Sequence, residues 1–226
     1  MCARYSLRAT NALIADLFDL MWVPAEVSPR YNIAPTQNAW VVRPGPDGPI
    51  LDSRSWGLIP NWARDPSVRT KLINARSETV MEKPSFREAW RHRRCLVPAD
   101  GFFEWRIERD GKQPFHIRFR DQHVFAIAGL YESWTGPDGS VEETFTILTT
   151  DASPWMADLH DRMPVILPPE AHRDWLYADD PNPLRALFAP FESPELEKVP
   201  VTRKMSRSNF EDLSCVERIA IQEPLF

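Results

Sequence analysis

The chain has 226 residues, of which 43% are hydrophobic and 26% are charged, values close to those of average soluble globular proteins. This composition argues against a disordered or fibrous protein, and the length suffices for one domain with a sizeable core. The net charge of −5 argues against bulk electrostatic binding to nucleic acid, but screening limits each charge to about 10 Å and leaves room for a local basic groove.

The three cysteines, Cys2, Cys95 and Cys215, are widely spaced and include no C-x-x-C pair. Such a set is typical of a reducing compartment and offers neither a zinc site nor a disulfide framework. The sequence shows no secretory signal and no apolar run of the length of a membrane span. We therefore expect a cytoplasmic protein that uses no membrane, metal or cofactor.

The first elements are a helix and a hairpin. Thr10 is a good N-cap, and apolar residues follow it at helical spacing as far as Met21, which predicts a helix over this stretch. Residues 39–43 and 50–56 flank a turn rich in Pro and Gly, so they predict a pair of strands. The polar run Asn74–Thr79 has the character of a helix entry.

Strands dominate the middle of the chain. Ser85 is expected to cap a helix that ends in the basic residues 91–94, where cations suit the helix dipole. Further strands are predicted at 94–99, 102–107, 114–120, 124–131 and 144–149. Ser153 and Pro154 then predict another short helix, and a brief strand at 165–167 precedes two more helices.

This density of strands predicts an α+β fold with one strongly curved, barrel-like sheet of mixed or antiparallel strands, flanked by short helices. The 22 prolines against 8 glycines favour such an irregular, sheet-rich architecture. No repeat, low-complexity segment or long linker interrupts the sequence. We therefore expect residues 1–226 to form a single domain.

Cys2 gains a reactivity that no internal cysteine shares if the initiator Met1 is removed. It then carries a free α-amine, with an ordinary pKa of about 8, beside a thiol with an ordinary pKa of about 8.5. Such a 1,2-aminothiol captures an aldehyde as an imine and then closes through sulfur into a stable thiazolidine. The alternative is that a cysteine at this position is accidental and the terminus frays.

Glu104 is a candidate acid-base group because it lies in the apolar stretch Phe102–Trp105. Strand alternation places its side chain on the same face as Phe102 and Arg106. A carboxylate held among aromatic side chains is partly desolvated, which raises its pKa toward the range of a general acid. The alternative is an ion pair with Arg106 on a solvated face.

Other polar positions also carry candidate chemistry. His160 can transfer protons near neutral pH, unless it is a structural histidine bonded to the backbone. Asn74 and Arg76 offer an amide that could orient a substrate and a guanidinium that suits a phosphate; the alternative is surface capping and ion pairing with Glu78. Arg4 shares the face of Cys2 if this segment is extended.

Six short motifs follow one another along the chain: Met1–Tyr5, Tyr31–Thr36, Trp56–Pro60, Asn74–Thr79, Gly101–Trp105 and His160–Pro164. In this order they closely resemble the motifs of the SOS-response-associated peptidase (SRAP) family, whose members shield abasic sites in single-stranded DNA. The resemblance spans residues 2–167. Phe103 stands where the family often has Tyr, and little matches after Leu167, so the resemblance assigns no role to the C-terminal part.

The resemblance implies a role for each candidate residue. The processed Cys2 would form a thiazolidine with the ring-opened aldehyde of an abasic site, and Glu104 would assist as acid and base. His160 would help to transfer protons, and Asn74 would orient the amine or the sugar. The side chains expected to contact DNA are Arg4, Arg76 and Arg162 for phosphates, and Pro35, Trp62 and Trp105 for bases.

The resemblance therefore implies a monomeric DNA-damage-response protein that cross-links itself to abasic sites in single-stranded DNA, in the cytoplasm or, in a bacterium, at the nucleoid. Two other classes stay open. One is an N-terminal-nucleophile thiol hydrolase or self-processing peptidase, in which Cys2 attacks an amide and Glu104 or His160 is the base. The other is a module that grips single-stranded or junction DNA without covalent chemistry.

Overall fold

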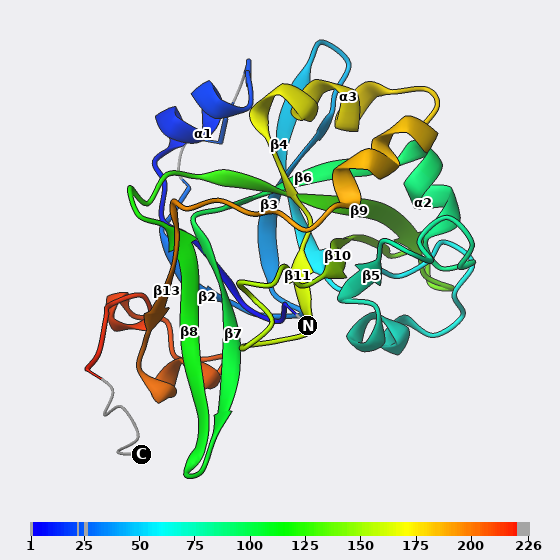
Figure 1. Ribbon diagram of the computed structural model, residues 1–226. Coiled ribbons are helices and arrows are strands. Elements are labelled where there is room, and N and C mark those ends of the chain that lie inside the picture. The colour runs from blue at the N-terminus through cyan, green and yellow to red at the C-terminus, as the bar shows by residue number, and fades with distance from the viewer. Residues whose placement is uncertain (1, 22, 25–26, 221–226) are drawn as a thin grey trace.

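Two β-sheets surrounded by short helices make up the computed structural model, which describes residues 2–21, 23–24 and 27–220 (Figure 1). The strands are β1 (Tyr5–Leu7), β2 (Arg30–Ile33), β3 (Asn38–Pro44), β4 (Pro49–Trp56), β5 (Asn74–Arg76), β6 (Arg94–Ala99), β7 (Gly101–Glu108), β8 (Gly111–Phe119), β9 (Phe125–Thr135), β10 (Val141–Asp151), β11 (Arg162–Pro164), β12 (Ile166–Leu167) and β13 (Leu196–Pro200). The α-helices are α1 (Asn11–Leu17), α2 (Arg87–His92) and α3 (His172–Tyr177). The 3₁₀ helices are η1 (Pro66–Lys71), η2 (Pro169–Ala171), η3 (Asn182–Phe188), η4 (Arg203–Ser206) and η5 (Leu213–Cys215).

One sheet closes on itself. Its strand order is β11-β10-β4-β3-β6-β9-β12, with β5 paired to β10, and β9 also pairs with β10. The strands β10, β4, β3, β6 and β9 therefore form a ring without free edges, which is a small barrel. Its pairs are mixed, because β10 runs parallel to β4 and β5 but antiparallel to β9. The predicted α+β fold with a curved, barrel-like mixed sheet is confirmed.

The second sheet, in the order β13-β8-β7-β1-β2, is antiparallel throughout. The sequence predicted one sheet, whereas the structure divides the strands between two. The chain passes from the barrel to the second sheet at Asp100, between β6 and β7. Its buried carboxylate accepts hydrogen bonds from the Ser6 hydroxyl at 2.6 Å and from the Arg8 backbone N–H at 2.5 Å, which fixes this crossing against β1.

One hydrophobic core joins both sheets. Tyr5 and Phe102 of the second sheet are fully buried in the same cluster as Trp56 and Phe145 of the barrel, and the rings of Tyr5 and Trp56 meet edge-on with centroids 5.3 Å apart. A smaller cluster on the opposite face of β7 holds Phe103 under the C-terminal segment. The alternation of faces along β7 therefore follows the predicted period of two residues.

The α-helices are shorter than the sequence suggested. Thr10 caps α1 as predicted, since its hydroxyl accepts the Leu13 N–H at 3.4 Å. The helix ends at Leu17 rather than near Met21, because the chain turns through Asp19, whose φ of 51° lies in the left-handed region. Among the helices of the described residues, none is long and apolar enough to cross a membrane.

Three local predictions were wrong. Ser85 does not cap α2, whose N-cap position is Phe86. Residues 154–159 form successive turns instead of a helix, and their buried members Met156 and Leu159 pack into the core. Asn74–Arg76 is a strand rather than a helix entry, because it pairs in parallel with β10.

Candidate functional site

Cys2 lies between the two sheets. Its side chain is fully buried, and its sulfur lies 3.7 Å from the Arg4 carbonyl. On one side, the Asn74 side-chain amide on β5 donates a hydrogen bond to the Cys2 carbonyl at 2.8 Å. On the other side, the Phe103 N–H on β7 donates to the Arg4 carbonyl at 3.0 Å. The segment before β1 is therefore held by both sheets at once.

Glu104 on β7 is buried beside Cys2. Only 2% of this residue is exposed, and burial raises the pKa of its carboxyl to about 7, with a further contribution from the charge of Asp161. Burial also raises the pKa of the Cys2 thiol well above its ordinary value, and the negative charge of Glu104 adds to this effect. The carboxylate and the thiol are therefore electrostatically coupled. Arg106, the partner considered from the sequence, pairs with Glu108 instead, at 2.8 Å.

His160 follows the turns after β10 and is partly exposed. Its Nδ1 accepts the Arg162 backbone N–H at 2.9 Å, which leaves the proton of the neutral ring on Nε2. The same nitrogen lies 2.7 Å from the Asp161 carboxylate, a contact that suits a proton on Nδ1, in the other neutral tautomer or in the protonated ring. Burial lowers the pKa of His160 against the opposing effect of Asp161, which favours the neutral ring. Because the Arg162 backbone N–H can only donate, the neutral ring carries its proton on Nε2.

Asn74 offers an unused acceptor next to Cys2. Its Nδ2 is committed to the Cys2 carbonyl, whereas its buried Oδ1 has no hydrogen-bond partner among residues 2–21, 23–24 and 27–220. A buried acceptor without a partner is costly, so an incoming donor at this point would be stabilised. Asn74 can therefore orient a donor group that arrives beside Cys2.

The arginines predicted to bind phosphates differ in how far their guanidinium groups are already bonded within the protein. Arg162 is buried, and its guanidinium binds Glu78 at 2.6 and 3.0 Å and Asp151 at 2.6 Å, so its contacts lend no support to a free phosphate site. Arg4 is half-buried, and one of its terminal nitrogens donates to the Ala3 carbonyl at 2.7 Å. Arg76 is exposed and forms no ion pair with any residue that the structure describes.

The residues predicted to stack on bases lie on different elements of the fold. Trp62 is 59% exposed, and its indole N–H donates to the Pro84 carbonyl at 3.3 Å. Trp105 is half-buried on β7, on the face opposite Glu104, and its indole N–H donates to the Ser206 hydroxyl at 3.0 Å. Pro35 is half-buried in the loop between β2 and β3.

Sequence reasoning missed two groups at the site and gave a third the wrong partner. Asp151 binds Arg162, and Asp161 influences both Glu104 and His160. Glu78 was considered as an ion-pair partner of Arg76, whereas its carboxylate binds Arg162. Asp161 stands inside a motif that had already been singled out, so its charge next to a histidine was a usable signal. Asp151 carried no such signal, because its contact depends on the register of β10 with β11.

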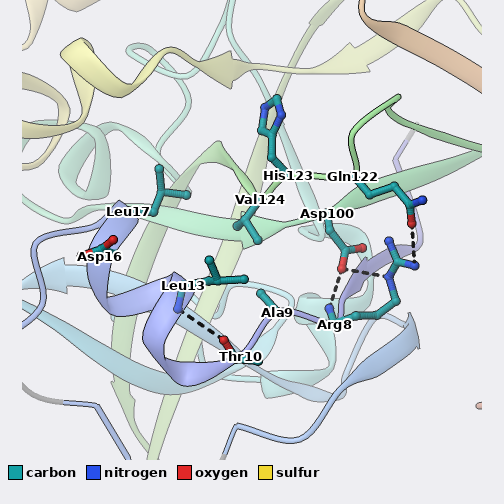
Figure 2. Close-up of a pocket in the computed structure, with 10 residues that line it drawn as sticks. All are labelled: Arg8, Ala9, Thr10, Leu13, Asp16, Leu17, Asp100, Gln122, His123 and Val124. Atoms are coloured by element: carbon teal, nitrogen blue, oxygen red, sulfur yellow. Dashed lines mark hydrogen bonds and ion pairs between the residues drawn. The ribbon is translucent and has the colours of Figure 1, made fainter.

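A pocket of about 530 Å³ lies elsewhere, beside α1 (Figure 2). Figure 2 shows the Arg8 side chain reaching Asp100 and Gln122 on one wall, while Leu13 and Leu17 of α1 form another. None of the predicted site residues lines this pocket. The candidate chemistry is thus concentrated at the junction of the sheets around Cys2 and not in this cavity.

Comparison with known proteins identifies the family. The family model described as "SOS response associated peptidase (SRAP)" matches residues 1–208. The abasic site processing protein YoqW of Bacillus subtilis is 41% identical over 207 residues, which cover 89% of this chain and 92% of that protein. The abasic site processing protein YedK of Escherichia coli is 36% identical over 182 residues, which cover 78% of this chain and 79% of that protein.

A solved structure agrees with this assignment. A Bacteroides thetaiotaomicron protein superposes with a TM-score of 0.87 at 28% identity, covering 97% of this chain and 100% of that one. The family match extends past Leu167, where the motifs found in the sequence end, and includes β13 and η4. The chain belongs to the SOS response associated peptidase family.

Proposed function

We propose that this protein captures abasic sites in single-stranded DNA covalently, through a thiazolidine formed by Cys2 after removal of Met1. The relatives are named abasic site processing proteins, which supports this substrate. The observation that carries the proposal is the coupling of the buried Cys2 to a carboxyl group, Glu104, whose pKa of about 7 suits proton transfer. While Met1 is attached, the Cys2 nitrogen is an amide and cannot form an imine.

The first step joins the α-amine of mature Cys2 to the aldehyde carbon of the ring-opened sugar. The nitrogen lone pair forms the C–N bond, a proton moves from nitrogen to oxygen, and loss of water from the carbinolamine gives a protonated imine, whose nitrogen keeps its remaining proton. The protonated carboxyl of Glu104 gives its proton to the departing hydroxyl. Its raised pKa keeps a large fraction of the carboxyl protonated near neutral pH.

The second step closes the ring. The Cys2 sulfur forms a bond to the carbon of the protonated imine, the C=N electron pair moves to nitrogen, and the thiol proton goes to a base. Because the pKa of the thiol is raised, the thiol stays protonated until a base assists it. The carboxylate left on Glu104 by the first step is that base, so one residue gives and then takes a proton.

Asn74 and His160 assist this chemistry. The Asn74 amide holds the Cys2 carbonyl, and its free Oδ1 accepts a hydrogen bond from the Cys2 amine or a sugar hydroxyl. His160, neutral with its proton on Nε2, supplies a donor when the sugar ring opens and when the adduct reverses.

Exposed cations and aromatic rings support the binding of a single strand. Trp62 offers a face for stacking, which is worth about 1–3 kcal/mol per base in such proteins. Lys83, which precedes the Pro84 that binds the Trp62 indole, is exposed, as is Arg76. Pro35 and Trp105 would contact bases near Cys2, whereas Arg4 and Arg162 would reach a phosphate only after their present contacts rearrange.

The thiol hydrolase alternative is less well supported. Hydrolysis by a cysteine requires a thiolate, which proteins favour with a lowered pKa. Burial instead raises the pKa of Cys2, and Glu104 adds negative charge. Imine formation starts from the amine and does not need a thiolate, so the environment fits the capture of an aldehyde better.

Denaturing electrophoresis tests the proposed function. Mature protein mixed with an oligonucleotide that carries one abasic site should give a band that resists SDS and heat, whereas Cys2→Ala and a form that retains Met1 should give none. An oligonucleotide without the lesion, and Cys215→Ala, are the controls for substrate and for loss of a remote thiol. An adduct that persists undiminished in Cys2→Ala would refute the proposal.

A further inference from the structure

The segment after β13, to which the sequence motifs assigned no role, packs against the outer face of β7. Met205 of η4 is fully buried there with Phe103 and Val199. The next residue, Ser206, accepts the Trp105 indole N–H at 3.0 Å. The position of η4 is therefore fixed relative to a predicted DNA-contacting tryptophan.

The same segment is also bound to β2. The Asn32 side-chain amide donates to the carbonyls of Met205, Arg207 and Phe210 at 2.9, 3.0 and 2.8 Å. Further along, the Glu211 carboxylate accepts the Asn32 backbone N–H at 3.1 Å. Because β1 lies between β7 and β2, the C-terminal segment spans the strand that leads from Cys2.

Two cations of this segment stand close together in the chain. The N–H of Arg207, the C-cap residue of η4, bonds to the Lys204 carbonyl at 3.1 Å, so one 3₁₀ turn separates the two residues. Met205 takes the face toward the core, and Arg203 takes another face, where it binds Asp110 at 2.8 Å. Lys204 and Arg207 are both exposed, and neither has an ion-pair partner within the described part of the chain.

We propose that Lys204 and Arg207 bind the phosphates of single-stranded DNA that runs past Trp105. This inference rests on the proposed function and adds a binding surface to it. An aromatic side chain flanked by unpaired cations is the arrangement that holds a single strand without reading its sequence. Most arginines of this acidic chain are committed to carboxylates or carbonyls, whereas the guanidinium of Arg207 is available to a phosphate beside Trp105.

The predicted DNA-contacting residues of the barrel and those of the second sheet lie on different sides of Cys2. Asn74 on β5 holds the Cys2 carbonyl from the side of the barrel, where Arg76 ends the same strand. The strand β7, which carries Trp105, holds the Arg4 carbonyl from the side of the second sheet. Exposed cations without ion pairs therefore lie both on the side of the barrel and on the side of the second sheet, and in this proposal Lys204 and Arg207 serve one flank of a strand captured at Cys2.

Salt-dependent binding tests this surface. The affinity for an undamaged single-stranded oligonucleotide is measured by fluorescence anisotropy over a series of NaCl concentrations, for wild type and for the double variant Lys204→Gln/Arg207→Gln. Each phosphate contact contributes about 0.7 to the slope of log K against log salt for single strands. Loss of two contacts should therefore reduce the slope by about 1.4 and weaken binding roughly ten-fold near 0.1 M salt.

The matched control is Arg120→Gln/Arg185→Gln, which removes the same charge from two exposed arginines without ion-pair partners in the described residues. Arg120 follows the end of β8 opposite the β7–β8 hairpin, and Arg185 lies in η3. The control should keep the wild-type slope. Equal slopes for the two double variants would overturn the proposal, because a general charge effect would then explain any loss.

Cross-linking separates this inference from the proposed function. Below saturation with abasic oligonucleotide, Lys204→Gln/Arg207→Gln should form adduct more slowly than wild type, in line with its weaker binding, whereas Arg120→Gln/Arg185→Gln should keep the wild-type rate. A wild type that binds DNA but forms no adduct would refute the proposed function alone. A wild type that forms adduct while the double variant keeps the wild-type slope would refute the binding surface alone.

Discussion

At the scale of single residues, the proposed chemistry depends on Glu104. A carboxyl group in solution is ionised at neutral pH and makes a poor acid there. Burial on β7, with the charge of Asp161, raises the pKa of Glu104 to about 7, so the group exchanges a proton near physiological pH. The same burial has a cost for folding, since ionised Glu104 lacks the solvation that it has in the unfolded chain.

This cost predicts how stability depends on pH. The folded pKa of about 7 lies above the ordinary value of 4.5, so the folded chain binds the proton more tightly. Stability from this group is fully present below about pH 4.5 and is lost as the pH rises to about 7. Glu104→Gln should flatten this dependence and raise the free energy of unfolding at pH 8, by at most about 3 kcal/mol.

Urea unfolding at pH 5 and pH 8 measures this effect. The difference between Glu104→Gln and wild type should grow in favour of the variant from the lower pH to the higher. Glu82→Gln, at an exposed position, is the control and should follow wild type at both values. A Glu104→Gln variant that is equally destabilised at both pH values would contradict the assignment.

At the scale of elements, the junction of β1, β7 and β8 depends on a glycine. A Cβ built on Gly101 would lie 2.0 Å from Nε2 of His116 on β8, a distance that no real contact allows. The same nitrogen lies 2.9 Å from the Ser6 hydroxyl on β1, so the imidazole has no room to retreat without breaking this contact. Close approach of three strands therefore requires glycine at this position.

The close contact between Gly101 and His116 predicts that a substitution of His116 compensates for one of Gly101. Gly101→Ala should destabilise the protein by about 1–3 kcal/mol through overpacking. In the background of His116→Ala, which removes the imidazole, Gly101→Ala should cost much less. The coupling is measured by a double-mutant cycle of thermal unfolding. Equal costs in the two backgrounds would show that His116 is not the group that excludes a side chain.

Elements with their own periodicity were predictable from the sequence. The hairpin of β3 and β4 and the alternation along β7 followed from local patterns, as did the Thr10 cap. The strand β5 was missed because it has three residues, and only its pairing with β10, far away in sequence, makes it a strand. Ser153 and Pro154 signalled a helix, but residues 154–159 form successive turns that bury Met156 and Leu159.

At the scale of the whole molecule, the site is assembled from distant parts of the chain. Cys2, Asn74, Glu104 and His160 were identified one by one from the sequence, with roles implied by the family resemblance. What the sequence could not provide was their geometry, because it depends on closure of the barrel between β9 and β10 and on β5 alongside β10. The burial of Arg162 by Glu78 and Asp151 depends on the same closure.

The C-terminal segment shows the same limit of sequence reasoning. The sequence motifs end at Leu167, yet the segment around η4 covers β7 and is bonded to both β2 and Trp105. Its single turn of 3₁₀ helix carries no periodicity that a pattern could reveal. The role proposed for Lys204 could be inferred only from the structure, which shows which of the other cations have ion-pair partners.

The central claim is that the reactive group is an aminothiol, and intact mass spectrometry tests it most directly. Mature protein incubated with an abasic oligonucleotide should give a species with the summed mass of both minus one water, without Met1 and without any reductant. Cys2→Ser keeps the amine but lacks the sulfur, so it should give a stable adduct only when borohydride reduces the imine, and that adduct is heavier than this species by two hydrogens. An equally stable adduct of Cys2→Ser without reductant, or an adduct that retains Met1, would contradict the account.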